Sequence, residues 1–263
     1  MICTFKKKIN FLSILIFGLV ITLTQVNANA VRNLTIYAEP NLFVALTKIA
    51  RIYSQNFSVN VSVNFNSSLD FVDEIDSGEP ADIFISAHPI FAETMKQKGL
   101  IDVYNIGYIA NDELILVTSN NNKELPVKFI GSNLSLEEAI KLIDKSKNNI
   151  ILDHEGNSSG YFAKSFLQNF TLENLSVFSK LPEDRNSIVR DLSSDPNSYA
   201  LIFASHLRHA KNLQILARKK DKNIYYRALV IAGDNMEVAR EFLKFLKKTQ
   251  SQKILQEHGF FIN

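Results

Sequence analysis

The chain has 263 residues, of which 46% are hydrophobic and 21% charged, with only 9 glycines and 6 prolines. This composition excludes collagen-like, low-complexity and wholly disordered chains, and the length fits one large domain or two small ones. Without residues 1–30, 26 basic residues stand against 27 acidic ones. Such a balance carries no electrostatic signature of a nucleic-acid or anionic-membrane partner.

The first thirty residues have the pattern of a cleavable export signal. A basic start at residues 6–8 precedes an apolar run at 11–23 and a small-residue site that ends at Ala30. The apolar run is shorter than the roughly 20 residues that span a bilayer. We therefore expect cleavage after Ala30 and a periplasmic location. Cys3 is the only cysteine, so the mature chain has no thiol for catalysis or metal binding.

The mature sequence alternates short apolar runs with helical spacing of apolar residues, which predicts an α/β fold with mainly parallel sheets covered by helices. The alternation starts again near Asn111. We expect strands at 34–38, 59–65, 82–86, 113–118, 150–152, 177–178, 199–204 and 226–231, and helices at 42–53, 69–75, from Pro89, 136–143, 161–170, 185–192, 236–248 and 251–258. The charged run 218–223 is predicted to be a solvated turn.

Small polar residues follow three of the predicted strands. These are Asn41, the pair Ser67 and Ser68, and the run Ser158, Ser159 and Gly160. Helix starts expose unpaired N–H groups and the positive end of the helix dipole, which favour an anion. Capping of the helices is the alternative for each junction alone. Because the carboxyl ends of parallel strands are where ligands bind, the three together leave a ligand site and helix capping as equal alternatives.

The segment 78–87, Gly-Glu-Pro-Ala-Asp-Ile-Phe-Ile-Ser-Ala, closely resembles a motif of the periplasmic molybdate-binding proteins that serve ABC importers. Further similar segments follow in the right order at 111–117, 153–164, 183–184 and 258–260. The resemblance covers most of residues 33–263. It implies two α/β lobes joined by a two-strand hinge and closing over a tetrahedral oxyanion. The restart of the alternation near Asn111 and the late strand at Tyr226 predict that one lobe holds residues 31–110 plus 227–263 and the other 111–226. The resemblance also implies a monomer whose partner is the membrane permease of the importer.

The resemblance carries a set of ligand-binding residues onto this chain, with departures. Ser68 falls at a family serine, and Ser159 falls where the family uses a main-chain N–H. Asn41 replaces another serine and Phe203 replaces a tyrosine, which removes one hydroxyl donor. Arg185 stands where an apolar residue gives a main-chain N–H, and it either binds the anion or pairs with a neighbouring acid in solvent. Molybdenum is expected only as its oxyanion, held by Asn41, Ser68 and Ser159.

Catalysis is not expected, and no cofactor is implied. The five histidines form none of the motifs of metal or nucleophile sites, and a metal pair of His206 and His209 is a minor alternative. Asp153, His154 and Glu155 lie beside the serines, but adjacent residues of one loop rarely converge on one reacting atom. Molybdate or tungstate is the first ligand to expect. The alternatives are sulfate, phosphate or an organic acid on the same scaffold, and a surface interaction protein with a vestigial cleft.

Overall fold

The computed structural model describes residues 31–262 except 130–132, 147, 181–186 and 208–209. The expected export signal and the candidate binding residue Arg185 therefore lie outside the described residues. In the described part of the chain, no helix has both the length and the apolar character needed to cross a membrane.

The described strands form one mixed eight-stranded sheet in the order β2-β1-β3-β8-β4-β7-β5-β6. β1 pairs in parallel with β2 and β3, and β5 pairs in parallel with β6 and β7. The pairs β3–β8, β4–β8 and β4–β7 are antiparallel. The strands are β1 (Arg32–Ala38), β2 (Val59–Phe65), β3 (Ile83–Ser86), β4 (Ile101–Ser119), β5 (Asn149–Asp153), β6 (Ser176–Lys180), β7 (Tyr199–Phe203) and β8 (Leu213–Ile231).

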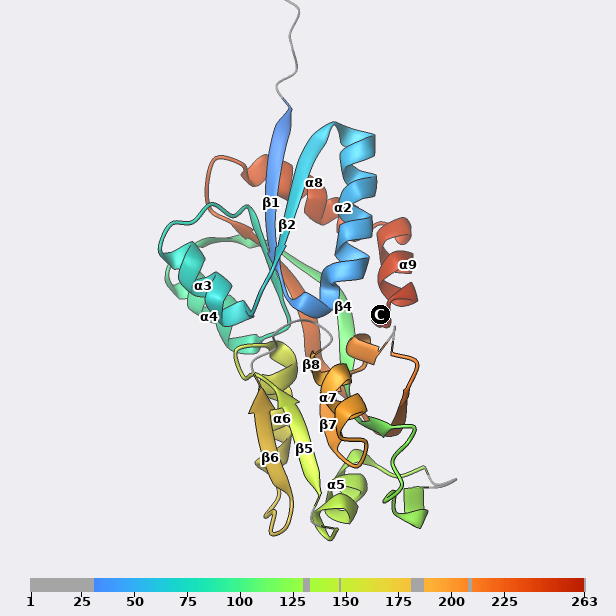
Figure 1. The fold of residues 1–263 in the computed structure, drawn as a ribbon. Helices are drawn as coiled ribbons and strands as arrows, with labels where there is room; N and C mark the ends of the chain where they lie inside the picture. The colour runs from blue at the N-terminus through green and yellow to red at the C-terminus, as the bar shows by residue number, and fades with distance from the viewer. Residues whose placement is uncertain (1–30, 130–132, 147, 181–186, 208–209, 263) are drawn as a thin grey trace, which may run out of the picture. The chain divides into compact units, whose positions relative to one another are not determined.

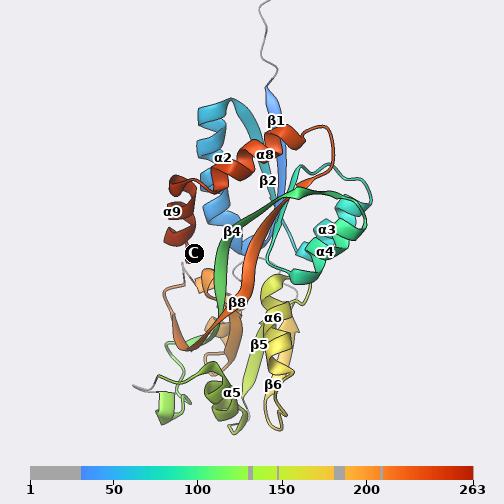
Figure 2. The ribbon, with the colours of Figure 1, turned by 180° about the vertical axis from the view of Figure 1, so that it is seen from behind.

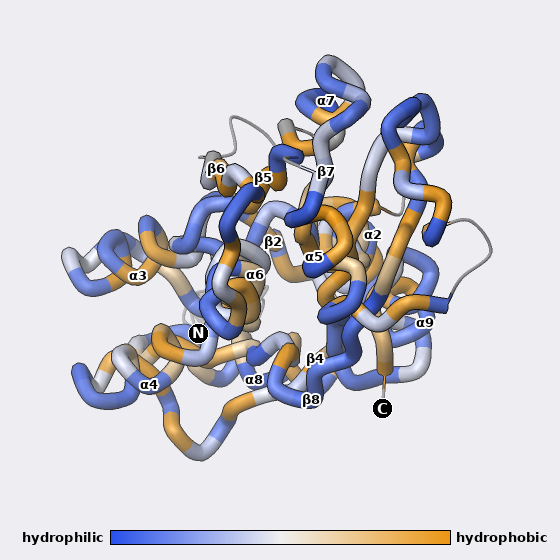
Figure 3. Tube along the Cα trace, turned by 90° about the horizontal axis from the view of Figure 1, so that it is seen from below, coloured by the Kyte–Doolittle hydropathy of each residue, from blue (hydrophilic) through white to orange (hydrophobic). Residues whose placement is uncertain are grey.

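Helices follow most of the strands, so the expected α/β alternation is confirmed. Orange and blue stretches succeed one another along α3 and α4, as one apolar face on each helix requires (Figure 3). The helices are α2 (Phe43–Phe57), α3 (Ser68–Asp76), α4 (Pro89–Gln97), α5 (Leu136–Asp144), α6 (Ser158–Leu167), α7 (Ser187–Ser194), α8 (Met236–Leu246) and α9 (Thr249–Glu257), with 3₁₀ turns η1 (Pro40–Leu42), η2 (Val127–Phe129) and η3 (Ala204–Leu207).

The two 19-residue strands β4 and β8 lie side by side and connect the β1–β3 part of the sheet to the β5–β7 part (Figures 1 and 2). We expected two separate sheets, and the structure differs. β8 pairs with β3 through its end, where Val230 faces Ile83, and with β4 along most of its length. Shifts of register along the β4–β8 pair mark bulges, which bend and twist a long strand pair.

The prediction of a solvated turn at 218–223 is wrong, because these residues lie inside β8. Pairing with β4 accommodates the charges. Arg218 forms an ion pair with Glu113 on β4, and Lys219 forms one with Glu137 on α5. Their long side chains reach carboxylates on neighbouring elements while the backbone continues the ladder, so local polarity does not end the strand.

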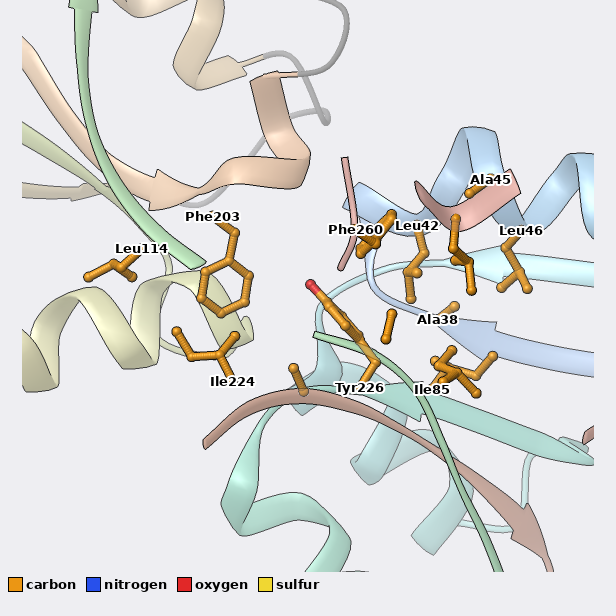
Figure 4. Packing of buried hydrophobic residues seen from close by; sticks show 14 of the residues in the cluster. Ala38, Leu42, Ala45, Leu46, Ile85, Leu114, Phe203, Ile224, Tyr226 and Phe260 are labelled. Carbon is orange, nitrogen blue, oxygen red and sulfur yellow. The ribbon is translucent and has the colours of Figure 1, made fainter. Parts of the chain in front are cut away.

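A continuous hydrophobic core extends from the β1–β3 part of the sheet to the β5–β7 part. Figure 4 shows Tyr226 between the group of Phe203, Leu114 and Ile224 and the group that includes Leu42 and Ile85, with its hydroxyl oxygen directed to the Phe203 side. Tyr226 and Phe203 are fully buried. A phenol at the centre of a core needs a polar partner.

Candidate functional site

A buried carboxylate lies at the end of β1 and is surrounded by serine hydroxyls. Glu39 directly follows β1, and its Oε1 accepts hydrogen bonds from Ser68 Oγ (2.6 Å), Ser86 Oγ (2.7 Å) and Ser158 Oγ. The serines belong to α3, β3 and α6. Ser68 and Ser158 are fully buried, and Glu39 is 3% exposed. We call Ser68, Ser86 and Ser158 the serine cluster.

The local sequence explains why the hydroxyls of Ser68 and Ser158 can bind Glu39 and are not used as helix caps. In α3 the capping role falls to Ser67, whose Oγ accepts from the Asp70 N–H (3.1 Å), so the next serine, Ser68, keeps its hydroxyl for another partner. In α6 Asn157 occupies the N-cap position and Ser158 is the first helical residue. The N-terminal ends of both helices, with the positive ends of their dipoles, therefore lie at the same region.

Burial raises the pKa of Glu39, since removal from water disfavours the charged carboxylate. The hydroxyls of Ser158, Ser68 and Ser86 oppose this rise, and the negative charge of Asp153 adds to it. Among the described residues, no lysine or arginine forms an ion pair with Glu39. Within the described ranges, hydroxyl and helix dipoles therefore surround this carboxylate instead of a cation.

A second polar group lies around Asn41. Its Nδ2 donates to Ser205 Oγ (2.8 Å) and to the hydroxyl of Tyr226, while its Oδ1 is buried without a hydrogen-bond partner. Nearby, Asp112 Oδ1 accepts from the Ser205 N–H (3.3 Å) and the Glu113 N–H (2.9 Å). Burial raises the pKa of Asp112 to about 7, and burial together with the charges of Asp112 and Glu39 raises the pKa of Tyr226.

The start of α6 approaches the preceding loop closely. A Cβ on Gly160 would lie 2.2 Å from the His154 carbonyl oxygen and 2.3 Å from that of Asp153. Only glycine fits there, because real Cβ atoms do not come so near to another atom. Ser159, the residue before, is buried, and its Oγ accepts from the Phe203 N–H (3.2 Å), which ties α6 to the end of β7.

Contacts also join α3 and α4 to the β5–α6 region. The Leu69 N–H donates to the Gly156 carbonyl oxygen (3.2 Å), and the His88 ring lies 4.4 Å from the Tyr161 ring, centroid to centroid. Burial lowers the pKa of His88 to about 4, so this ring is neutral at neutral pH. These contacts between α3, the start of α4 and the β5–α6 region therefore close one side of the serine cluster.

The five residues expected in the ligand site have different surroundings. Ser68 contacts Glu39, Asn41 contacts Ser205 and Tyr226, and Ser159 binds the main chain of Phe203. Asn41 lies in η1 rather than at the start of an α-helix. Phe203 is buried, and its ring centroid is 5.9 Å from that of Phe162. Arg185 lies outside the described residues.

Sequence reasoning missed Glu39 and Ser86 as parts of this site. Ser86 stands in the segment 78–87 that carries the family resemblance, and Glu39 stands between the first predicted strand and Asn41. An acidic residue at the carboxyl end of a buried strand was the available signal. Its burial could not be inferred, since the enclosing hydroxyls come from distant parts of the chain.

The residues near Ser158 and Ser159 that could imitate a catalytic set have structural partners. Asp153 Oδ1 accepts from Asn157 Nδ2 (2.9 Å) and the His154 N–H (2.7 Å), and burial raises its pKa to about 6. Glu155 forms an ion pair with Lys164 on the surface. In the described part of the chain, no group of three or more histidine, cysteine or acidic residues could hold a metal ion.

Polar groups that gather at strand ends of an α/β sheet are typical of proteins that bind small ligands there. The family model for bacterial extracellular solute-binding proteins matches residues 34–261. The chain belongs to this family. It is therefore a solute-binding protein and not an enzyme.

Individual relatives are distant. The molybdate-binding protein ModA of Escherichia coli is 24% identical over 235 residues, which cover 87% of this chain and 89% of the relative. The structure of a tungstate ABC transporter protein from Geobacter sulfurreducens has a TM-score of 0.69 at 12% identity and covers 86% and 98% of the two chains. PEB3, a Campylobacter jejuni protein, solved with bound L-phospholactate, has a TM-score of 0.62 at 17% identity and covers 88% and 100%. These structural likenesses show the fold.

Proposed function

We propose that this protein captures a small tetrahedral oxyanion outside the cytoplasm and delivers it to the membrane permease of an ABC importer. The observation that carries the proposal is the serine cluster. Hydroxyls from α3, β3 and α6 converge on one buried negative group, and two of them stand at helix N-termini. Such an arrangement stabilises negative charge without a full countercharge.

The proposed site includes Asn41, Ser68, Ser159 and Phe203 together with Arg185. Molybdate and tungstate are the first ligands to test, because relatives of this chain carry those names. The family supports an extracellular location, and we keep cleavage after Ala30 and a monomeric state as parts of the proposal.

We further propose two lobes that move about the paired strands β4 and β8, with residues 31–110 and 227–263 in one and 111–226 in the other. The pairing of the end of β8 with β3 supports this division. Ligand binding is then a closure of the lobes over the serine cluster.

A second candidate ligand class is favoured by Glu39. A negative group already occupies the centre of the serine cluster, so an anion that carries a proton or less charge, such as hydrogen phosphate or an organic acid, fits the scaffold as an alternative. The relatives include a protein solved with L-phospholactate.

The test is calorimetry and thermal unfolding of the purified mature chain with molybdate, tungstate, sulfate and phosphate, on wild type, Arg185→Ala and Phe203→Tyr. A ligand that binds only the native state raises the free energy of unfolding by about 2.7 kcal/mol at a hundredfold excess over its Kd. Arg185→Ala weakens every anion if the guanidinium faces the site. Absence of any stabilisation by all four anions in all three variants contradicts an oxyanion-binding function.

A further inference from the structure

The protons available in the serine cluster set a limit on what can bind there. Each serine hydroxyl has one proton to donate, and a carboxylate only accepts. Ser68, Ser86 and Ser158 all lie within hydrogen-bond distance of Glu39 Oε1. The lone pairs of Ser86 Oγ also accept the His88 N–H (2.9 Å). Ser68 Oγ also lies 2.9 Å from Ser86 Oγ, but its contact with Glu39 is shorter (2.6 Å). The hydroxyl protons are thus directed to Glu39, and the lone pairs of the serines are what remains for a ligand.

A fully deprotonated oxyanion offers only acceptors to this arrangement. To bind, it would have to turn the serine protons away from Glu39 and leave a buried carboxylate without donors. A ligand that carries a proton on one of its oxygens can instead donate to Glu39 while its other oxygens accept from main-chain N–H groups. A polar group left without a hydrogen-bond partner in a buried site costs binding free energy. This cost discriminates strongly between a deprotonated oxyanion and one that carries a proton.

The electrostatic surroundings of Glu39 favour a complex in which one proton is shared between this carboxylate and the ligand. In the part of the chain that the structure describes, the charged or titratable groups that interact with it are Asp153 on β5 and Tyr226 on β8, and Asp112 on β4 in turn faces Tyr226. None of these described groups is a cation. The histidines that adjoin the region, His88 and His206, are neutral because burial lowers the pKa of each to about 4.

We propose that Glu39 is a specificity-determining residue that selects oxyanions carrying a proton, with hydrogen phosphate as the representative, against fully deprotonated ones such as sulfate, molybdate and tungstate. The inference rests on the proposed oxyanion-binding function and narrows its ligand class. One proton is shared between Glu39 and the ligand in the complex. Hydrogen phosphate brings this proton, whereas sulfate or molybdate requires its uptake from solvent.

The experiment compares the affinities of inorganic phosphate, sulfate and molybdate by calorimetry for wild type, Glu39→Gln and the control Glu79→Gln. Glu79 is exposed in the loop between α3 and β3, so its substitution makes the same change of net charge away from the serine cluster. A glutamine at position 39 keeps an acceptor for the hydroxyls and supplies an N–H donor for a deprotonated ligand. We expect wild type and Glu79→Gln to prefer phosphate, and Glu39→Gln to shift the ratio toward sulfate and molybdate by at least about tenfold.

A second measurement uses wild type alone and does not depend on the folding of a variant. Between about pH 7 and about pH 9 the affinity for sulfate relative to phosphate falls, by up to about tenfold per pH unit, because only sulfate binding takes up the extra proton. Charge effects of Asp112, Asp153 and Tyr226 act on both anions and largely cancel in this ratio.

The outcomes separate the two proposals. If the anions bind but Glu39→Gln leaves their ratio unchanged, or the wild-type ratio does not vary with pH, the role of Glu39 is overturned and the oxyanion-binding function stands. If none of the anions binds to wild type or to Glu39→Gln, the oxyanion-binding function itself is contradicted.

Discussion

Asp102 and Glu113 on β4 form ion pairs with arginines, whereas Glu39 and Asp112 are buried among hydroxyls and main-chain N–H groups. Arg240 donates through Nε (2.9 Å) and a terminal nitrogen (2.6 Å) to Asp102 Oδ2, and this lowers the pKa of Asp102. Glu39 and Asp112 have raised pKa values from burial.

The difference shows that acidic residues of one sheet have two kinds of surroundings, and that each kind suits a different role. A carboxylate paired with an arginine keeps its charge and links elements, here β4 with α8. A carboxylate compensated only by dipoles is less stable in its charged form, and it leaves the surrounding donors able to exchange partners. The second arrangement suits a region that must accept an incoming anion, and the substitutions below test the contrast.

The largest expected effect comes from Gly160→Ala, which disturbs the backbone at the start of α6, next to the serine cluster. The new methyl group would overlap the carbonyl oxygens of His154 and Asp153, so α6 must shift. We expect a loss of about 3 kcal/mol or more in the free energy of unfolding, measured by urea denaturation.

Gly233→Ala is the matched control, since a Cβ at this position would have no atom within 4 Å and the φ of Gly233 lies outside the left-handed region. It should change stability by less than about 1 kcal/mol, in the stabilising direction. A Gly160→Ala protein as stable as this control would mean that the start of α6 can relax.

Ser68→Ala removes one hydroxyl from the serine cluster. Without this proton, the charged group formed by Glu39 and a bound anion loses one hydrogen-bond donor. This loss should weaken oxyanion binding by about 2 to 3 kcal/mol, a factor of roughly 30 to 150 in Kd, by calorimetry. Ser77→Ala, at the C-terminal end of the same helix, is the control, because Ser77 is exposed and its Oγ donates to the Glu74 carbonyl oxygen (2.7 Å). Equal affinities for the two variants would place the ligand elsewhere.

Asp112→Asn tests whether a carboxylate without a cation destabilises the fold. The folded-state pKa of about 7 lies above the ordinary value of 3.8, so the folded state holds the proton more tightly and stability falls as pH rises from 3.8 to about 7. Asparagine removes this loss. We expect the variant to be more stable than wild type by about 2 kcal/mol at pH 8 and the gain to shrink at pH 5, in urea denaturation at both values. A variant less stable at pH 8 would show that Asp112 has a favourable partner.

Asp102→Asn should have the smallest effect and the opposite sign. The folded-state pKa of Asp102 lies below 3.8, so its contribution to stability is present above that pH and is lost as pH falls through the lowered value. Because the Arg240 side chain is 39% exposed, solvent screens the pair. We expect a loss of about 1 kcal/mol at neutral pH, reduced in high salt. A loss that does not respond to salt would point to packing rather than charge.

Much of the fold follows from local patterns in the sequence. The α5 helix is an example, since Ser135 and Glu138 form a capping box directly before the apolar positions of residues 136–143. The length of β8 does not follow. Its charged stretch is stabilised as a strand by pairing with β4, a contact between distant segments that no local pattern contains.

The sequence predicts which helices and strands carry the site residues, but it does not predict which side chains contact one another. Ser68 and the start of α6 were recognised because small polar residues follow predicted strands. Which hydroxyl faces which group depends on the register between helices from different parts of the sheet. Glu39 was therefore missed, although it lies two residues before Asn41, which was recognised.

The position of β8 in the sheet affects the order in which the chain can fold. β8 lies between β3 and β4 and is followed only by α8 and α9, so the sheet stays open until almost the whole chain has been synthesised. A chain that emerges with its N-terminus first cannot complete its hydrophobic core early, and contacts of such long sequence separation form slowly. A chain that ends before β8 therefore leaves β3 and β4 as the edges of two separate pieces of sheet.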